Sequence, residues 1–407
     1  MDANAIAVTG MGVVTPVGIG VEDYWNALLA GRCGVGRITR FDAEALAVKI
    51  AAEVRDFRPE DFLPRWLISQ TDSFTQFAYA AAEQALGPGG LPAAPERCGI
   101  VMGTAMAGIA TTAATQEMLT CAVHKNVGPR FVPRILANIA AGQIAIARNI
   151  RGPSLTISTA CASGGDAISS AAMLLRAGEA DTVLVVGAES ILCPLVIYSL
   201  ANAQVLSRAN DTPELACRPF DRQRSGFVIG EGGGALLLET AAHATARGAE
   251  ILGELAGWAS NSDAHHVTDP EPNGERAADC MRAALSRARM AAADIGYINA
   301  HGTGTRAGDA AEAEAVRRVF GTGDGAPRVS STKGATGHMM GAGGVTEAIA
   351  CLLALQRGAL PPTLNLEQPD APLNLVARTA ERRQIAAAMS NAFGFGGQNS
   401  SLVFRRG

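Results

Sequence analysis

The sequence has few aromatic residues, 5% of 407, and no excess of positive charge. Its 34 lysines and arginines face 38 aspartates and glutamates, which gives a formal net charge of −4. Because a nucleic-acid-binding domain usually carries a basic face, this balance argues against nucleic acid as a partner. No apolar run reaches the length of a membrane span, so we expect no membrane association either.

The eight cysteines are scattered, and no two of them form a C-x-x-C pair. This spacing excludes a small disulfide scaffold and favours reduced thiols in a cytoplasmic protein. The first residues enter a strand-like segment without a basic or a long apolar stretch, so we expect no secretion signal. A P-loop, an H-E-x-x-H helix and a G-x-S-x-G elbow are also missing, which argues against the enzyme classes that depend on them.

One motif near the N-terminus is incomplete. Val8 to Gly12 half-resembles a dinucleotide-binding fingerprint, but Thr15 stands where the third glycine should fall. An acidic residue that would bind a ribose at the end of a second strand is not evident either. We therefore interpret residues 6–12 as a strand followed by a glycine-rich turn, without a dinucleotide.

The sequence does contain an alternation of apolar strands and helices, with 48% hydrophobic residues. Residues 73–86 have the pattern of a helix, and the continuous apolar run at 182–189 is typical of a strand inside a parallel sheet. The alternation starts over at residue 251. It predicts an α/β protein with an internal duplication, whose halves, residues 1–250 and 251–407, form one compact body.

Cys161 stands where a predicted strand, residues 154–157, turns into a predicted helix, residues 166–180. The free N–H groups and the positive dipole end of a helix N-terminus favour the thiolate form of cysteine and can hold an oxyanion. Residues 162–165 are small, so neighbouring backbone can approach closely. We expect Cys161 to be a nucleophile, although an isolated cysteine is more often inert core.

Three segments of the second half carry further motifs that we consider together with the Cys161 motif. They are residues 299–305 (NAHGTGT), 331–338 (STKGATGH) and 391–397 (NAFGFGG). With these four motifs in order, the sequence resembles the β-ketoacyl-acyl-carrier-protein synthases, condensing enzymes of the thiolase superfamily, over essentially its full length. It is most similar to the elongating branch of fatty-acid synthases and to the ketosynthases of type II polyketide assembly. The resemblance implies a thiolase-like duplicated fold, whose two similar halves give a layered α/β/α/β/α sandwich.

The resemblance also implies a two-step reaction. An acyl chain moves from the phosphopantetheine of an acyl carrier protein onto Cys161; malonyl-carrier protein then loses CO₂, and its enolate attacks the acyl-enzyme. The N–H groups of Cys161 and Phe395 match the family's oxyanion hole. His301 and His338 match the histidine pair that donates to the malonyl thioester carbonyl, and Lys333 matches the lysine that fixes His338. No bound cofactor is expected.

A further set of residues matches the family's substrate contacts. Phe395 matches the gate between Cys161 and the acyl pocket, and the glycines around it predict a hinge-like loop. The set comprises Thr303 and Thr305 at the phosphopantetheine arm, Asp263 and His266 in a mobile gating loop, Met106, Phe131 and Leu200 along the acyl tunnel, and Gly394, Gly396 and Gly397 in the hinge-like loop.

Glu347 lies on the predicted helix after the last histidine motif and is similar to the family's carboxylate behind the site. A buried carboxylate needs a partner, and Glu347 would surround a structural monovalent cation together with Asn299, Ser390 and Asn391. We expect no catalytic metal, because the two adjacent histidines of the gating loop point apart and no third ligand has suitable spacing.

Two other functions share this fold. A thiolase would carry a second reactive cysteine in its C-terminal glycine-rich loop, and residues 393–399 contain none. A chain-length subunit is a binding protein that has lost the nucleophile, whereas this chain keeps Cys161 together with both histidines and the lysine. Both alternatives are therefore less consistent with the sequence than a condensing enzyme.

The expected partners are an acyl carrier protein and a second subunit, either a second copy of the chain or a chain-length subunit. Relatives usually contact acidic carrier proteins through lysines and arginines. In one segment where such cations are common, residues 65–70, this chain has a single cation, and Gln204 occupies another such position. Trp66 in that segment is either an exposed apolar contact or a buried residue. We hypothesise a specialised fatty-acid or type II polyketide synthase with its own carrier; the alternative is a housekeeping elongation synthase. The cations that remain nearby are Lys125, Arg130 and Arg208.

Overall fold

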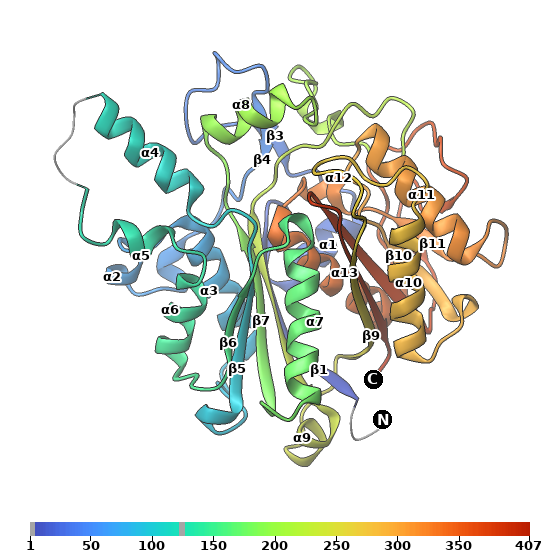
Figure 1. The fold of residues 1–407 in the computed structure, drawn as a ribbon, viewed down its shortest axis with the longest axis horizontal. Coiled ribbons are helices and arrows are strands. Elements are labelled where there is room, and N and C mark those ends of the chain that lie inside the picture. The colour runs from blue at the N-terminus through green and yellow to red at the C-terminus, as the bar shows by residue number, and fades with distance from the viewer. Residues whose placement is uncertain (1–4, 122–126) are drawn as a thin grey trace.

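The computed structural model describes residues 5–121 and 127–407. A 12-stranded mixed sheet forms its centre, and Figure 1 shows this sheet surrounded by helices. The mixed sheet and the alternating elements confirm the predicted α/β class. Among the helices of the described segments, none has both the length and the apolarity that a membrane crossing requires.

Five strands in each half follow the same plan. When the five strands of a half are counted along the chain, they lie side by side in the sheet in the order third, second, fourth, fifth, first. The second strand pairs in parallel with the third and the fourth, whereas the fifth pairs antiparallel with the fourth and the first. This repeat confirms the predicted duplication. The strands are, in the first half, β1 (Ile6–Thr15), β5 (Cys98–Gly103), β6 (Ser154–Ile157), β7 (Thr182–Glu189) and β8 (Gly232–Thr240), and in the second, β9 (Gly253–Ser262), β10 (Ile295–Asn299), β11 (Arg328–Ser330), β15 (Ala387–Gly394) and β16 (Gln398–Arg405).

The two half-sheets are joined where β1 pairs antiparallel with β9. Two further strands extend the sheet: β2 (Gly18–Ile19) pairs with β1, and β13 (Asn374–Leu375) pairs with β11 at the outer edge of the second half. Outside it, β3 (Val35–Arg37) pairs with β4 (Ile50–Ala52), and β12 (Ala359–Leu360) pairs with β14 (Glu381–Arg382).

Helices form three layers around the half-sheets (Figure 1). The outer layers are α3 (Ser73–Leu86) and α6 (Ile139–Arg148) on the first half-sheet, and α10 (Glu275–Ala288) with α11 (Arg306–Phe320) on the second. The middle layer is α7 (Ser163–Arg176) and α13 (Gly343–Arg357), which contact strands of both halves. This arrangement confirms the predicted α/β/α/β/α layers. The remaining α-helices are α1 (Val21–Leu29), α2 (Arg65–Ile68), α4 (Ile109–Thr120), α5 (Phe131–Ile135), α8 (Pro194–Asn202), α9 (Ala241–Ala246) and α12 (Lys333–Thr336).

The middle helices touch through glycines at their N-terminal ends. A Cβ on Gly164 would lie 2.7 Å from the Gly341 carbonyl oxygen, and one on Gly344 would lie 2.4 Å from the Gly165 nitrogen. Only glycine allows backbone to come this close. The crossing therefore holds the N-terminal end of α7, which follows Cys161, against the N-terminal end of α13, which follows His338.

The glycine-rich turn predicted after residue 8 is wrong, because β1 continues to Thr15. Gly10 and Gly12 lie inside the strand, where a Cβ would stand 2.0 Å from the carbonyl oxygens of Ala85 and Ala81 in α3. These glycines allow the helix to pack directly on the strand, which accounts for the incomplete nucleotide motif.

Candidate active site

Cys161 lies on a sharp connection between β6 and α7. The preceding Ala160 has a φ of 50°, in the left-handed region that a residue with a Cβ occupies at a cost of about 1–3 kcal/mol. The Ser163 hydroxyl holds this turn, since it accepts from the Thr159 N–H at 2.9 Å and donates to the Ala160 carbonyl at 2.6 Å. The predicted strand-turn-helix position of Cys161 is confirmed, although α7 spans 163–176 rather than 166–180.

Three groups from the second half surround the Cys161 sulfur. Nε2 of His338 lies 3.1 Å from Sγ, and Sδ of Met340 lies 3.8 Å from it. The backbone N–H of Phe395 donates to the same sulfur. The Phe395 N–H, one of the two expected oxyanion donors, thus reaches Cys161 from a distant part of the chain.

The expected thiolate is not the resting form of Cys161. Burial raises the pKa of the thiol to about 12, and the charge of Lys333 and the Phe395 N–H only partly oppose this effect. The sequence revealed the helix N-terminus but not the apolar walls that desolvate the sulfur. The nucleophile is therefore a thiol that needs a base at the moment of attack, and Nε2 of His338 is in hydrogen-bond contact with it.

The two predicted histidines lie side by side. Their ring centroids are 5.2 Å apart at an interplanar angle of 84°, and the rings of Phe227 and Phe393 pack against them. Burial, together with the charge of Lys333, lowers the pKa of both His301 and His338 well below the usual range. Both imidazoles are consequently neutral at physiological pH, as expected, and the Nδ1 atom of each is buried without a partner in the described part of the chain.

Lys333 pairs with a different residue from the one expected. Its ammonium forms a buried ion pair with Glu347 of α13, whereas the sequence predicted that it fixes His338. A buried carboxylate is costly unless it is paired, and this lysine is its partner. Lys333 influences the histidines through its charge, because it contributes to the lowered pKa of both.

Sequence reasoning missed Glu312, which positions the first histidine. Its carboxylate accepts from the backbone N–H groups of His301 at 2.8 Å and Gly302 at 2.7 Å, and burial raises its pKa to about 7. Asp309, one turn earlier on α11, accepts from the Gly304 N–H at 3.0 Å. The sequence feature that could have identified Glu312 and Asp309 is a pair of acidic residues, three positions apart, on the helix that directly follows the histidine motif.

The residues proposed for a monovalent cation lie together behind the site. Asn299 in β10 stands beside Ser390 in β15, and both side-chain polar atoms of Asn299 are buried without a partner in the described residues. Asn391 accepts from the Ser401 hydroxyl at 2.9 Å. The unpaired Asn299 oxygen is a ligand that fits a cation, whereas Glu347 already pairs with a lysine. Among the described residues, no three His, Cys, Asp or Glu side chains cluster as metal ligands.

A cavity of about 420 Å³ opens in front of the sulfur. Its apolar walls suit an acyl chain. Its polar side contains Thr303 and Thr305, whose hydroxyl oxygens lie 3.0 Å apart. The cavity brings together these predicted residues: Cys161, His301, His338, Thr303, Thr305, Met106, Leu200, Asp263, Gly394, Phe395 and Gly397.

Three residues of the predicted set do not line this cavity: Phe131, His266 and Gly396 of the hinge-like loop. Phe131 begins α5, which lies with α4 on an arm that projects from the body (Figure 1), and it lines a separate cavity of about 400 Å³. His266 is exposed, and its ring accepts from the Asp269 N–H at 3.0 Å. The expectation that Phe131 lines the acyl tunnel is therefore not met within one chain, whereas His266 was expected in the gating loop rather than in the cavity wall.

The loop that contains Asp263 is tied to the loop that contains Phe395. The Asp263 N–H donates to the Gly397 carbonyl at 2.8 Å, and the Gly396 N–H donates to the Val267 carbonyl at 2.6 Å. Phe395, 38% exposed, lies at the tip of the hairpin between β15 and β16. These two hydrogen bonds couple the expected gate and the expected gating loop.

The comparisons with known proteins match the whole chain to one family. The model for the beta-ketoacyl synthase N-terminal domain matches residues 3–244, and the C-terminal domain model matches residues 252–367. The 3-oxoacyl-[acyl-carrier-protein] synthase 2 of Coxiella burnetii is 41% identical, with 100% of this chain and 99% of that protein covered. The protein of the same name from Vibrio harveyi is 40% identical, with the same coverage.

Two solved structures share the fold closely. The ishigamide ketosynthase/chain length factor matches with a TM-score of 0.90 and 34% identity over 99% of both chains. A type II PKS acyl-carrier protein in complex with its ketosynthase, bound to the hexaketide, matches with a TM-score of 0.86 and 31% identity, again over 99% of both chains. With two family models and relatives matched over its full length, the chain belongs to the β-ketoacyl synthase family.

Proposed function

We propose that this protein is a β-ketoacyl-acyl-carrier-protein synthase, a decarboxylating acyltransferase. The observation that carries the proposal is the contact of Cys161 Sγ with His338 Nε2 at 3.1 Å, with the His301 ring beside it in one cavity. In the first step the sulfur bonds to the acyl carbonyl carbon, and the carrier thiol leaves with a proton. In the second step malonyl-carrier protein loses CO₂, its enolate carbon bonds to the acyl carbon, and the bond to Cys161 breaks.

His338 is the base of the first step. A thiol with a pKa of about 12 is a poor nucleophile at neutral pH, and the neutral imidazole in contact with it accepts its proton during attack. The N–H groups of Cys161 and Phe395 then stabilise the oxyanion, and each such donor contributes about 3 kcal/mol.

Decarboxylation uses both histidines as neutral hydrogen-bond donors. Negative charge develops on the malonyl thioester oxygen as CO₂ leaves, and a neutral imidazole can donate there without losing its proton. Lys333, held in place by its ion pair with Glu347, favours the neutral form of both rings through its positive charge.

The protonation state of the two rings gives a direct test. We expect both to remain neutral from about pH 8 to about pH 6, because burial and Lys333 depress their pKa below the ordinary value near 6.5. Below about pH 6.5 the unfolded chain binds more protons at these sites than the folded chain, so their contribution to stability is lost as the pH falls. Ring NMR signals, assigned with His301→Ala and His338→Ala, measure this; a midpoint near pH 6.5 for either ring would contradict it.

Gly394 offers a test of the oxyanion hole. A Cβ at this position would lie 3.0 Å from the Cys161 nitrogen and 2.8 Å from the Thr159 carbonyl oxygen, so alanine must push the hairpin away from the turn. We expect Gly394→Ala to slow acylation about 10²-fold, the scale of a misplacement by about 1 Å. Gly89→Ala is the matched control, because nothing lies within 4 Å of its Cβ. Equal acylation rates in both variants would remove Gly394 from the oxyanion hole.

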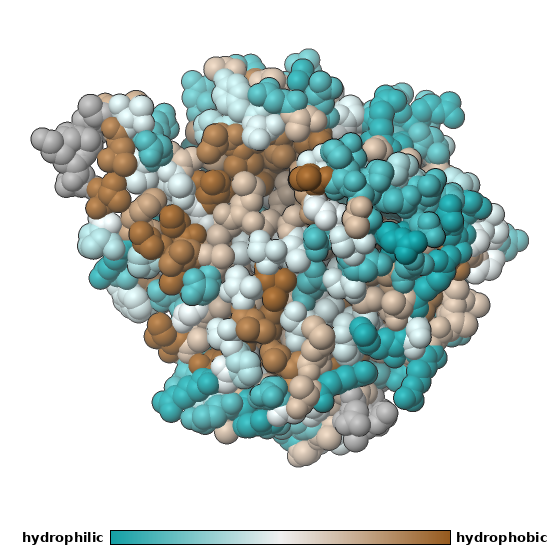
Figure 2. Space-filling view, in the orientation of Figure 1, coloured by the Kyte–Doolittle hydropathy of each residue, from teal (hydrophilic) through white to brown (hydrophobic). Residues whose placement is uncertain are grey.

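We propose that the projecting arm and the edge strand β6 contact a second subunit. Figure 2 shows apolar side chains gathered on this side of the molecule, and a sheet edge with exposed apolar residues favours association. A second subunit seated here would allow Phe131, which does not line the Cys161 cavity of its own chain, to contribute to an acyl tunnel. The exposed apolar residues are Met118 and Leu119 on α4, Val132 on α5, Leu136 just after α5, Ile146 on the neighbouring α6 and Leu155 on β6.

We propose that the surface expected to meet the carrier protein favours a specialised pathway. Trp66 is 58% exposed on α2, so the alternative that it is a buried residue is wrong. Arg130 and Arg208 are exposed as well, whereas Lys125 lies outside the described residues. Few cations and one exposed tryptophan favour a dedicated carrier over a generic acidic one.

Two measurements test this function and its pathway. Intact-mass spectrometry of the chain, after incubation with a panel of acyl-carrier proteins, should show acylation at Cys161 by the carrier encoded beside it and slower acylation by a housekeeping fatty-acid carrier. Sedimentation of the purified chain, alone and with a candidate chain-length subunit, gives the subunit state. Equal rates with both carriers in a stable, active homodimer would establish an ordinary elongation enzyme instead.

A further inference from the structure

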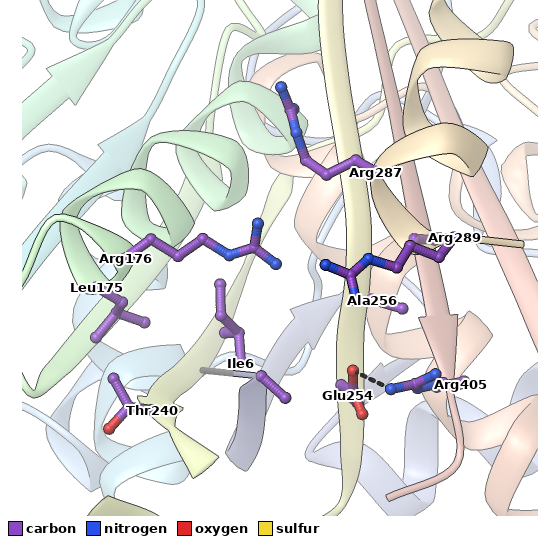
Figure 3. Close-up of a pocket in the computed structure, with 11 residues that line it drawn as sticks. Ile6, Leu175, Arg176, Thr240, Glu254, Ala256, Arg287, Arg289 and Arg405 are labelled. Atoms are coloured by element: carbon purple, nitrogen blue, oxygen red, sulfur yellow. Dashed lines mark hydrogen bonds and ion pairs between the residues drawn. The ribbon is translucent and has the colours of Figure 1, made fainter. Parts of the chain in front are cut away.

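Four arginines line a second cavity, of about 490 Å³, at the other end of the middle layer. Figure 3 shows Arg176 of α7 and Arg289, just after α10, extending toward each other across it, with Arg287 and Arg405 nearby. α7 has 14 residues, so its C-terminal arginine lies about 21 Å along the helix from its start beside Cys161. The arginine cavity shares no lining residue with the catalytic cavity.

One of the four arginines has a carboxylate partner among the described residues. Arg405 pairs with Glu254 at 2.8 Å, whereas Arg176, Arg287 and Arg289 form no salt bridge there. Glu254 is the one acidic residue in the lining. Among the residues that the structure describes, three guanidinium groups of the cavity therefore have no carboxylate side chain paired with them.

Trp258 fixes the position of two of these groups. The guanidinium carbons of Arg176 and Arg287 stand 4.6 and 5.0 Å from the centroid of its ring, and Arg287 also donates to the Trp258 carbonyl. Trp258 itself is 4% exposed, so it is a rigid platform. A guanidinium held on an aromatic face loses little further freedom when it binds an anion.

Helix dipoles offset only part of the positive charge of the four arginines. α7 ends at Arg176, and Arg289 follows the last residue of α10, so both arginines complement helix C-termini. Each C-terminus carries roughly half a negative charge. Two such ends and Glu254 offset about two of the four positive charges, which leaves an excess of about two in a partly enclosed space.

We propose that this cavity binds a multiply charged phosphate group, of the pyrophosphate type found in nucleoside diphosphates. Arginine forks match phosphate oxygens in pairs, and the volume lies in the range of small-molecule sites and exceeds what one phosphate fills. The Thr240 side chain adds a hydroxyl-bearing residue to the lining, and Ile6 and Ala256 add apolar surface.

The experiment uses the full-length protein and three probes: inorganic phosphate, inorganic pyrophosphate and ADP. Trp258 is one of three tryptophans, and its contact with two of the arginines makes its fluorescence a reporter, with Trp258→Phe as the control for the signal. Calorimetry gives the affinity independently. The test variant is Arg176→Gln with Arg289→Gln, and the matched control is Arg282→Gln on α10, where the lost charge lies outside the cavity.

We expect saturable binding of pyrophosphate and ADP in the wild type and in Arg282→Gln, weakened at least tenfold in the double variant. Similar affinities for pyrophosphate and ADP would identify the phosphates as the recognised group, and a much tighter ADP complex would identify a nucleotide as their source. No saturable binding of any probe, or equal affinity in the double variant and the control, would overturn the proposal. Cys161→Ala should bind the probes unchanged, and loss of binding there would overturn the separation of the two cavities.

Discussion

Replacing Cys161 with alanine is expected to reduce acylation and condensation by about 10⁶-fold, the scale seen when a catalytic nucleophile is removed. The sulfur is the atom that forms the covalent bond, and no other cysteine lines the cavity among the described residues. The fold should survive, because alanine is smaller than cysteine and the turn is held by the Ser163 hydroxyl rather than by the thiol. Circular dichroism and intact-mass spectrometry check the two parts of this expectation.

Two further variants sharpen the test of the nucleophile. Cys161→Gln should keep the decarboxylation of malonyl-carrier protein, because the amide can occupy the place of the acyl thioester beside the Phe395 N–H. Cys121→Ala, which removes an exposed cysteine on the arm, should leave both steps unchanged. Acylation of Cys161→Ala at the wild-type rate would show that another residue is the nucleophile.

Local patterns were enough to predict much of the fold and the centre of the site. The apolar run at 182–189 and the helix at 73–86 end at the predicted residues, because flanking residues stop them. The glycines around Cys161 correctly indicated close backbone contact, which the structure places between α7 and α13. Such features depend on neighbours in the chain, so the sequence contains them.

Features assembled from distant elements could not be predicted in this way. The pKa of Cys161 depends on burial, which sums contacts with walls from both halves. Lys333 and Glu347 are 14 residues apart in the chain, and the ion pair between them depends on how the segment that connects α12 to α13 folds. The arginine cavity likewise draws one or two residues from each of α7, α10, β9 and β16, and no local pattern connects them.

Replacing His301 or His338 with alanine should suppress decarboxylation about 10²–10³-fold each, the usual effect of removing one donor to a developing oxyanion. The effects on acylation should differ. His338 contacts the Cys161 sulfur at 3.1 Å, so its loss also removes the base of the first step, whereas His301 has no hydrogen bond to the sulfur among the described residues.

The ratio of the acylation rate to the decarboxylation rate therefore distinguishes the role of His301 from that of His338. Acylation is followed by intact mass and decarboxylation by release of CO₂ from malonyl-carrier protein, with His243→Ala on α9 as a control for the loss of a histidine elsewhere. We expect His301→Ala to acylate at close to the wild-type rate and to fail mainly in decarboxylation, and His338→Ala to be slow in both. If both variants lost the two half-reactions equally, the histidines would share one role, and the short contact between His338 and Cys161 would have no special part in acylation.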